Sequence, residues 1–403
     1  MLRAGFLLFL FSVSSHAAML PGFRAELVGA TPMFITSIAI DSHDNIYYSL
    51  AGGQLQRLGP DGKSTLVATL PTAWEGNAGL LGVALLDDTS AVVHYTTPGR
   101  GYHRISRINL ATGAERILLD LASDPDVPGR EVPTEHHGGN LIVAPDRSVF
   151  FGIGDFGGFL PASLPQWIAG KIWRLTPDGK LQMWALGVRN PFDIAWDPDL
   201  QRVIVPDNGP TAGDEVNIVP SGGNCGWPFT FGTQPSFEGD VVPAYVFDDT
   251  VAPTGLLRLS GANPLLHHGY LLGAFVTKAI YYFPDFSGRP IPLFEQFAGG
   301  VIIDVAESRD GTIYFATGNG IWRLHLPPRG DCNGDGEIDS RDLAALSLEL
   351  ADGSSPKPAV DAPAGAYAGS WGCDVNADDI VDGADYVALA KIVGGRPRAV
   401  RHH

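Results

Sequence analysis

One pattern recurs along residues 22–326 of this 403-residue chain: an apolar stretch, a turn containing Asp with Pro or Gly, and an alternating strand. It is clearest at residues 38–49, 141–152, 194–205 and 305–316, with a weaker copy at 83–88. The turn Asp residues lie 47, 58, 53 and 111 positions apart, and they are Asp41, Asp88, Asp146, Asp199 and Asp310. Because the last interval holds two units, the recurrence predicts six units of roughly 50 residues each.

Strands joined by Asp/Pro/Gly turns are expected to form hairpins. A four-stranded unit cannot bury both of its faces alone, so six of them should close into a ring. The 50 Gly and 31 Pro residues favour many tight turns, and no long segment of helical period occurs before residue 330. The sequence therefore predicts an all-β, six-bladed β-propeller over residues 20–326. A second motif, at residues 55–62, 172–179 and 321–324, is expected to end the units.

The sequence changes character after a short linker, residues 327–330. Residues 331–395 hold two acidic 12-residue loops, 43 positions apart, each followed by an apolar-periodic helix, which predicts a small α-helical domain. Loop positions 1, 3, 5, 7, 9 and 12 supply the oxygen ligands of EF-hand-type calcium sites. In loop one these are Asp331, Asn333, Asp335, Glu337, Asp339 and Asp342, and in loop two Asp374, Asn376, Asp378, Ile380, Asp382 and Asp385.

Loop one has Gly336 at the sharp turn, whereas loop two has Asp379 there. Asp at position 12 and a single helix after each loop resemble dockerin repeats, and this resemblance implies a cohesin-like protein partner. The equivalent positions of Cys332 and Cys373 predict a disulfide between the two repeats, with Cys225 left over in a structural role.

The N-terminal residues 1–17 have one early Arg, a short apolar run and small residues, which is typical of a secretory signal peptide. The protein is therefore expected to be secreted, periplasmic or at the cell surface, with no membrane span. Residues 396–403 form a basic tail. The chain has 27 Lys and Arg against 44 Asp and Glu, a net charge of −17, which argues against nucleic acid as a partner.

Several segments of the propeller are more specific than its repeats. They are residues 136–141 (HHGGNL), 152–155 (GIGD), 187–193 (GVRNPFD), 207–217 and 222–228. In this order they resemble the soluble quinoprotein sugar dehydrogenases, which use pyrroloquinoline quinone (PQQ) on a six-bladed propeller. The resemblance covers roughly residues 20–326.

The resemblance implies that His136 is the catalytic base and that Asp155 orients it, with His137 as the alternative base. An imidazole of near-neutral pKa suits the removal of a proton from a sugar hydroxyl. Calcium at the quinone would act as a Lewis acid. The implied calcium ligands are the backbone carbonyls of Gly209 and Pro210, and the implied cofactor contacts are Asn77, Arg189, Asn190, Asn208, Thr250 and Lys278. Asp214 and Glu215 are interpreted as structural anchors of their loop.

The chain departs from the family where an Arg-x-Arg pair would grip the anionic cofactor, because Val301 and Ile303 stand there. Each lost charge-assisted hydrogen bond is worth roughly 1.5–3 kcal/mol. The leading hypothesis is a secreted oxidoreductase that transfers hydride from an aldose-type sugar to calcium-bound PQQ and is tethered by its dockerin-like module. A non-catalytic propeller that has lost PQQ, and a calcium-dependent lactone hydrolase with carboxylates on the central channel, are the alternatives. The sequence names neither the sugar nor the electron acceptor.

Overall fold

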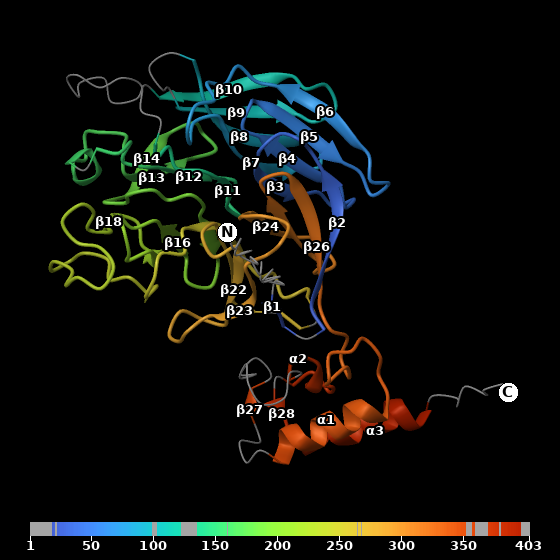
Figure 1. Cartoon of the computed structure of the whole chain (residues 1–403). Helices are drawn as coiled ribbons and strands as arrows, with labels where there is room; N and C mark the ends of the chain where they lie inside the picture. The colour runs from blue at the N-terminus through green and yellow to red at the C-terminus, as the bar shows by residue number, and fades with distance from the viewer. Residues whose placement is uncertain are drawn as a thin grey trace, which may run out of the picture.

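The computed structural model describes residues 18–20, 22–98, 103–121, 135–158, 160–263, 265–266, 268–351, 357–358, 370–378 and 380–395. The predicted signal peptide and basic tail lie outside these residues. Six sheets of four or five strands follow one another around a common centre, in the order of the chain (Figure 1). The six-bladed β-propeller expected from the repeat is therefore the observed fold.

The first three blades are each built in chain order from the centre outward. Blade I contains β3 (Ile35–Ile40), β4 (Ile46–Leu50), β5 (Gln54–Leu58) and β6 (Ser64–Thr69). Blade II contains β7 (Leu80–Asp87), β8 (Ser90–Thr96), β9 (His103–Asn109) and β10 (Glu115–Leu121). Blade III contains β11 (Leu141–Val143), β12 (Val149–Ile153), β13 (Lys171–Leu175) and β14 (Leu181–Leu186), with β18 (Gly223–Asn224) added in parallel to β14. A 3₁₀ helix, η1 (Leu160–Ser163), lies between β12 and β13.

Blade IV is also built in chain order, whereas blades V and VI each include a strand from near the N-terminus. Blade IV contains β15 (Ala195–Asp197), β16 (Arg202–Asp207), β17 (Glu215–Val219) and β19 (Tyr245–Val246). Blade V contains β20 (Pro253–Arg258), β21 (Tyr270–Ala274), β22 (Ala279–Phe283) and β23 (Ile291–Glu295), and β1 (Ala18–Met19) at its outer edge. Blade VI contains β24 (Ile302–Glu307), β25 (Ile313–Thr317), β26 (Gly320–His325) and, as its outermost strand, β2 (Arg24–Ala30).

The pairing of β2 with β26 closes the ring, because it joins the start of the propeller to its end through antiparallel partners such as Arg24 and His325. This pairing also corrects the expectation that the second motif ends each unit. The motif falls on β5, β13 and β26, each of which is the third strand of its blade. A fourth strand follows it in blades I and III, and β2 takes that place in blade VI.

The Asp turns connect the first and second strands of their blades. In blade I, one carboxylate oxygen of Asp41 accepts hydrogen bonds from the backbone N–H groups of His43 and Asn45, both at 2.9 Å. Blade V lacks this Asp, which is why its turn was not visible in the repeat. There Asn263 accepts instead, from the N–H groups of Leu265 (2.9 Å) and Leu266 (2.8 Å).

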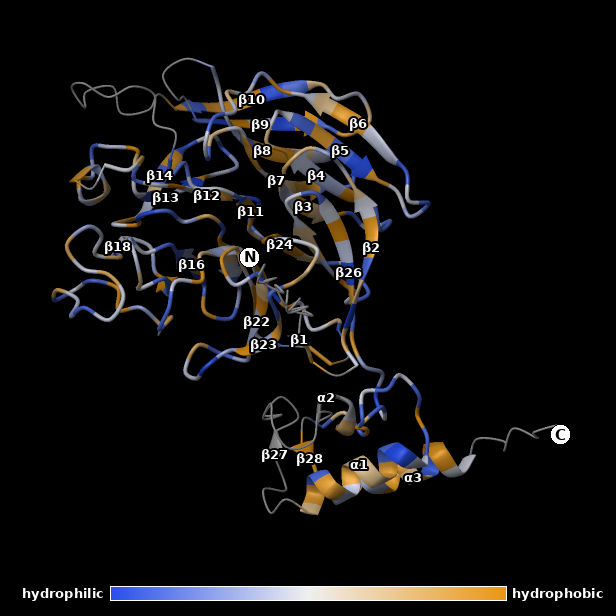
Figure 2. Ribbon diagram, viewed as in Figure 1, coloured by the Kyte–Doolittle hydropathy of each residue, from blue (hydrophilic) through white to orange (hydrophobic). Residues whose placement is uncertain are grey.

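Apolar side chains fill the spaces between neighbouring blades, and the strands mix apolar and polar residues along their length (Figure 2). Fully buried residues such as Phe294 and Phe315 join blades V and VI in one such cluster. The blades therefore hold one another by burial of apolar area, which contributes roughly 25 cal/mol per Å². A rigid ring of this kind fixes the loops at its ends.

A ring of small or polar residues surrounds the axis, one on each blade, immediately before a buried apolar residue of the inner strand. These residues are Ser37, Gly82, Asn140, Asp193, Gly255 and Asp304. Asp304 accepts hydrogen bonds from the N–H groups of Val305 in its own blade (2.8 Å) and Ile38 in the next (2.7 Å). Asp193 does the same with Ile194 (2.8 Å) and Leu256 (2.7 Å). The buried N–H groups at the axis are thus paired across blade boundaries.

The C-terminal module consists of α1 (Ser340–Ala351) and α3 (Gly383–Gly395), which lie side by side, with the short α2 (Ser370–Cys373) and the paired strands β27 (Lys357–Pro358) and β28 (Ile380–Val381) (Figure 1). Leu346 and Leu389 are fully buried between them. The predicted disulfide between Cys332 and Cys373 is present, and Cys225 is a buried free thiol. Among the described residues, no helix is both long and apolar enough to cross a membrane.

Candidate functional site

The topology brings the predicted propeller residues to one face of the ring. In an antiparallel four-stranded blade, the connection from strand two to three and the connection to the next blade lie at the same end. His136, Arg189 and Asn190 lie in connections to the next blade, as do Asn77 and Thr250. The connections from strand two to strand three carry Asp155, Asn208, Gly209, Pro210 and Lys278. Residues spread over some 200 positions of sequence therefore share one face.

The imidazole of His136 is bound by the carboxylate of Asp155, with Nδ1 and Oδ1 2.6 Å apart. The carboxylate is fully buried and the imidazole is 14% exposed, so the pair opens to solvent only at the histidine. Because an ionised carboxylate accepts, Nδ1 carries the proton and donates it. The lone pair of Nε2 is then free to take a proton, which is the arrangement of an oriented general base.

Two further N–H groups hold the Asp155 carboxylate in place. The backbone N–H of Gly157 donates to Oδ1 at 2.8 Å, and the indole N–H of Trp227 donates to Oδ2 at 2.8 Å. Trp227 lies on the segment after β18, which runs parallel to β14 and so leads the chain back to this face. No role was predicted for Trp227, because it is 72 residues from Asp155 along the chain.

Arg189 extends this group toward the predicted calcium ligands. Its guanidinium lies over the Trp227 ring, 5.6 Å from the centroid. Its Nη1 donates to the carbonyl oxygens of Asn208 (2.9 Å) and Gly209 (3.0 Å). The base, its carboxylate, an indole, a cation and one predicted metal-binding carbonyl, that of Gly209, thus form one connected network.

Buried carboxylates fix the two loops of this network. Asp207 accepts hydrogen bonds from the N–H groups of Arg189 and Asn190, both at 2.7 Å. Asp214 accepts from the N–H of Gly209 at 2.8 Å and from those of Val251 and Ala252 in the next connection. The predicted anchoring role of Asp214 is confirmed by these bonds. Burial raises the pKa of Asp207 to about 7 and, with the same cause, the pKa of Glu215 to about 7.

A cavity of about 410 Å³ opens beside this network. Asn77, Asn190 and Asn208 line it, whereas Arg189, Thr250, Lys278 and His136 do not appear in its wall. The aromatic side chains in the wall are Phe34, Trp74, Phe192 and Phe275. Among the described residues that line the cavity, none carries an ionised side chain, so its wall is aromatic and amide in character.

The remaining predicted contacts lie near the cavity. The Thr250 hydroxyl donates to the carbonyl of Thr211, so it ties two loops together. Lys278 is half-buried at the start of β22, and its backbone is in the left-handed region at φ 50°. Ile303, which stands where the resemblance implies an arginine, lines the cavity and is 1% exposed.

Of the two adjacent histidines, only His136 has a solvent-accessible imidazole. His137 is fully buried, and its Nδ1 lies 3.2 Å from Nε2 of His103. The alternative assignment of His137 as the base therefore does not suit its position. His94 and His103, which the sequence did not single out, form a hydrogen-bonded chain with His137.

Residues 37–324 match the sequence profile of the Glucose / Sorbosone dehydrogenase family. The chain belongs to this family. The aldose sugar dehydrogenase YliI of Escherichia coli K12 is 27% identical over 279 residues, which cover 60% of this chain and 74% of the relative. In the solved structure of the E. coli soluble aldose sugar dehydrogenase in the apo form, 99% of that chain aligns with 75% of this one at 20% identity, with a TM-score of 0.66. The PQQ-bound aldose sugar dehydrogenase of Streptomyces coelicolor aligns over 76% of this chain and 99% of its own, at 20% identity and a TM-score of 0.64.

The family match ends before the C-terminal module, where the two predicted calcium loops have the same internal bonding. In loop one, Asp342 at position 12 accepts from the N–H groups of Asn333 (3.1 Å) and Asp339 (2.7 Å). In loop two, Asp385 accepts from Asn376 (3.1 Å) and Asp382 (2.8 Å). Both position-12 carboxylates are fully buried. Each loop is therefore wrapped around its final carboxylate.

The loops differ in the charges around them. In loop two, carboxylate oxygens of Asp374, Asp378 and Asp385 lie within 4.8 Å of one another. In loop one, Arg341 pairs with Asp335 at 2.6 Å and with Asp339 at 3.0 Å. An internal cation therefore already neutralises two predicted ligands of loop one, whereas Ala384 stands at the equivalent place in loop two.

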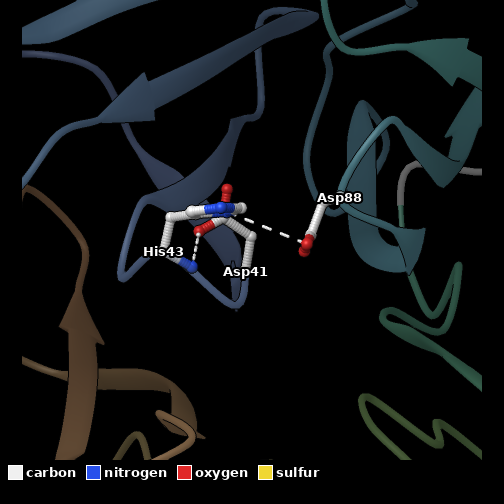
Figure 3. Close-up of side chains that lie close together, drawn as sticks. All are labelled: Asp41, His43 and Asp88. Atoms are coloured by element: carbon white, nitrogen blue, oxygen red, sulfur yellow. Dashed lines mark hydrogen bonds and ion pairs between the residues drawn. The ribbon is translucent and has the colours of Figure 1, made fainter.

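A second cluster of potential metal ligands belongs to the turns of blades I and II. Figure 3 shows the side chains of Asp41, His43 and Asp88 close together. The Asp41 carboxylate is used within its own turn, and Asp88 accepts two hydrogen bonds from Ser42, at 2.5 and 3.1 Å. These turns connect first and second strands, at the end of the ring opposite the candidate site. The cluster is explained by turn structure and inter-blade contact.

The two axial carboxylates bear on the lactone-hydrolase alternative, which requires open carboxylates on the channel. Asp193 and Asp304 are buried on the axis, but both oxygens of each accept backbone N–H groups. Burial raises the pKa of Asp304 to about 7, and burial with the nearby charge of Asp304 raises the pKa of Asp193. The oxygens of Asp193 and Asp304 are used in hydrogen bonds that stabilise the propeller. They therefore do not support a metal site of the kind that the lactone-hydrolase alternative requires.

Proposed function

We propose that the protein is a PQQ-dependent oxidoreductase that oxidises a hydroxyl group of an aldose-type sugar. The family supports oxidoreductase activity in general, and the bonded pair of His136 and Asp155 is the observation that carries the proposal. The pair lies on the same face as the cavity, and Gly139, three residues from His136, lines that cavity. A base and a ligand pocket are thus held together by one short loop.

The cavity has features that fit a polar, planar cofactor. Asn190 lines the cavity, and its Oδ1 is buried without a hydrogen-bond partner among the described residues, so it can bind a ligand atom. The aromatic side chains offer flat apolar walls, and Asn77, Asn190 and Asn208 offer amide donors and acceptors. Arg189 and Lys278 would meet the carboxylates of the cofactor. When bound, PQQ supplies an electron-poor carbonyl that accepts hydride, and calcium on the carbonyls of Gly209 and Pro210 polarises it.

Residues of this protein would accept the proton of the sugar hydroxyl and stabilise the resulting charge. His136 Nε2 would accept the proton of the sugar hydroxyl, and the resulting imidazolium would be stabilised by Asp155 through Nδ1–H. Trp227 and Gly157 keep the carboxylate oriented, since each N–H occupies one of its oxygens. Arg189, packed on Trp227, connects this orientation to the loop of Gly209.

The proposal includes export and a tether. The signal-peptide pattern of residues 1–17 supports a place outside the cytoplasm, and the two wrapped loops of the C-terminal module support calcium binding there. A dockerin-like module of this kind would bind a cohesin-like partner. The disulfide between Cys332 and Cys373 agrees with an oxidising environment.

One observation favours the non-catalytic alternative. The described residues in the cavity wall include no cation, and Ile303 takes the place of an implied arginine. A cofactor carrying three carboxylates would depend on Arg189 and Lys278, neither of which lines the cavity. Such a protein could keep the fold and a pocket for an uncharged ligand while binding PQQ weakly.

The test is a titration of the calcium-loaded protein with PQQ, followed by the absorbance of the bound quinone and by dye reduction with a panel of aldoses. We expect saturable uptake at micromolar quinone and sugar-dependent dye reduction. His136→Gln should abolish turnover and keep the uptake, whereas His43→Gln, on the opposite face, should change neither. Absence of saturable uptake would establish the non-catalytic alternative in place of the proposal.

A further inference from the structure

Three imidazoles form a hydrogen-bonded chain beneath the His136 loop. His94 Nε2 lies 2.8 Å from His103 Nδ1, and His103 Nε2 lies 3.2 Å from His137 Nδ1. The far end of the chain is the carbonyl of Gly139, 3.0 Å from His94 Nδ1. His94 and His137 are fully buried and His103 is 1% exposed. The mechanism proposed above uses none of the three.

The carbonyl of Gly139 fixes the direction of every bond in the chain. A carbonyl can only accept, so His94 Nδ1 must carry a proton. In a neutral imidazole the other nitrogen is then an acceptor, so His94 Nε2 accepts from Nδ1–H of His103. By the same step, His103 Nε2 accepts from Nδ1–H of His137. His94 and His103 are therefore in the Nδ1–H tautomer, and His137 donates through its Nδ1–H.

The surroundings keep the imidazoles of His94 and His103 neutral. Phe151 packs against His94 at 5.4 Å between ring centroids, and Phe156 packs against His103 at 5.5 Å. Burial in these apolar surroundings lowers the pKa of His94 to about 4 and places that of His103 well below its usual value. Neither His94 nor His103 hydrogen-bonds a carboxylate among the described residues, so the neutral form of these two imidazoles is the stable one.

Both ends of the chain lie on the same loop. It begins at the side chain of His137 and ends at the carbonyl of Gly139, two residues further on, after crossing His103 on β9 and His94 on β8. Because the Gly139 carbonyl cannot take up a proton, the row of imidazoles cannot conduct protons along its length. Its hydrogen bonds instead hold His137 and Gly139 of the loop against blade II.

The loop needs such support because its backbone is strained. His136 has φ 52°, in the left-handed region that a non-glycine residue rarely adopts. Gly138 follows at φ 77°, and a Cβ on Gly139 would lie 1.8 Å from the carbonyl oxygen of Phe192. His136 thus stands directly before the first held residue of a tightly packed turn.

We propose that His94, His103 and His137 form a closed clip that fixes the loop of residues 136–139 and so positions the imidazole of His136 against Asp155. His94 and His103 are positioning residues, since neither touches the cavity. The catalytic consequence rests on the proposed function, whereas the clip itself is a property of the fold.

The first experiment needs no variant. In protein labelled with ¹⁵N-histidine, long-range ¹H–¹⁵N spectra report which ring nitrogen carries the proton. We expect three slowly exchanging imidazole protons, all on Nδ1, assigned to His94, His103 and His137. An Nε2–H tautomer at His94 or His103, or rapid exchange of these protons with solvent, would overturn the clip.

The second experiment breaks the clip with His103→Phe, and uses His43→Phe as a matched control on the opposite face. We expect His103→Phe to shift and broaden the His136 ring signals and to lower kcat by about tenfold, as misplaced catalytic groups do, with KM changed less than kcat. The control should leave the His136 signals unchanged. If His103→Phe also leaves them unchanged, the positioning role is wrong. If the signals move in a protein that never takes up PQQ, the clip stands and the proposed function fails.

Discussion

The guanidinium of Arg189 is bonded to the carbonyl oxygen of Gly209, with Nη1 3.0 Å from it. The same nitrogen lies 2.9 Å from the carbonyl oxygen of Asn208. Gly209 is one of the two residues expected to bind calcium through its carbonyl. In this structure that carbonyl already faces a cation, so the oxygen has the orientation that a positive ligand requires. Arg189 and calcium must share it or exclude each other.

Arg189→Gln is therefore expected to strengthen calcium binding to the propeller in the absence of quinone, because the competing charge is removed. Isothermal titration should show one additional or tighter binding event beyond those of the C-terminal loops. Arg258→Gln, which removes an arginine paired with Asp199 on another blade, serves as the control. An identical calcium titration for Arg189→Gln and the control would show that the guanidinium does not compete.

The bond from Trp227 to Asp155 predicts a second effect. Trp227→Phe keeps an aromatic ring but removes the indole N–H, which leaves Asp155 Oδ2 buried without this donor. The free energy of unfolding should fall by about 1–3 kcal/mol. We expect lower stability in urea unfolding and a lower kcat. Trp196→Phe is the matched control, because its indole N–H is buried without a partner among the described residues. Equal losses of stability in the two variants would contradict the role given to the Trp227 bond.

The fold was predictable where the chain repeats a local pattern and not where distant segments pair. The turn Asp residues identified five hairpins, and the spacing supplied the sixth. Blade V remained unseen because Asn263 performs in its turn the bonding that Asp performs elsewhere. The ring closure through β2 joins segments almost 300 positions apart, such as Glu26 and Arg323, and no local pattern encodes that pairing.

In the candidate site, too, local motifs were predictable from the sequence, whereas contacts between distant residues were not. His136 and Asp155 were predicted because the segments that hold them resemble motifs of a known family. Trp227 and the buried histidines were missed because their partners lie on other blades or other strands, and a buried His in a strand has no distinctive spacing. The direction of the Arg189 side chain, toward backbone carbonyls and out of the cavity wall, follows from packing on Trp227. Residue identity alone does not encode that direction.

The C-terminal loops predict unequal calcium sites. Arg341→Ala should raise the calcium affinity of loop one, because it frees the carboxylates of Asp335 and Asp339. Lys391→Ala, an exposed change on the helix after loop two, is the control. Calcium titration followed by helical circular dichroism measures both. If the two variants bind calcium alike, Arg341 does not hold the loop-one ligands.

His94 and His103, two of the three buried histidines of the clip, predict how stability depends on pH. Unfolded, each would take up a proton near the ordinary value of 6.5, whereas folded His94 stays neutral down to about pH 4 and His103 lies well below its usual value. Between these limits the unfolded chain binds more protons, so falling pH destabilises the folded protein. Each such histidine contributes about 1.4 kcal/mol per pH unit to this slope.

The axial carboxylates act in the opposite sense, because the raised pKa of Asp304, about 7, makes the folded state lose stability as pH rises from 3.8 toward 7. A single pH profile therefore mixes the two effects, and a difference between variants separates them. His103→Phe removes one of these histidines. Its free energy of unfolding is measured with urea at several pH values between 4 and 6.5. As the pH falls, this free energy should decrease less steeply than that of the wild type, and the difference in slope should correspond to about one proton. His43→Phe, an exposed histidine, should keep the wild-type slope. If the slope of His103→Phe is also unchanged, His103 is not held neutral in the folded protein, and the reading of the chain as a neutral clip is wrong.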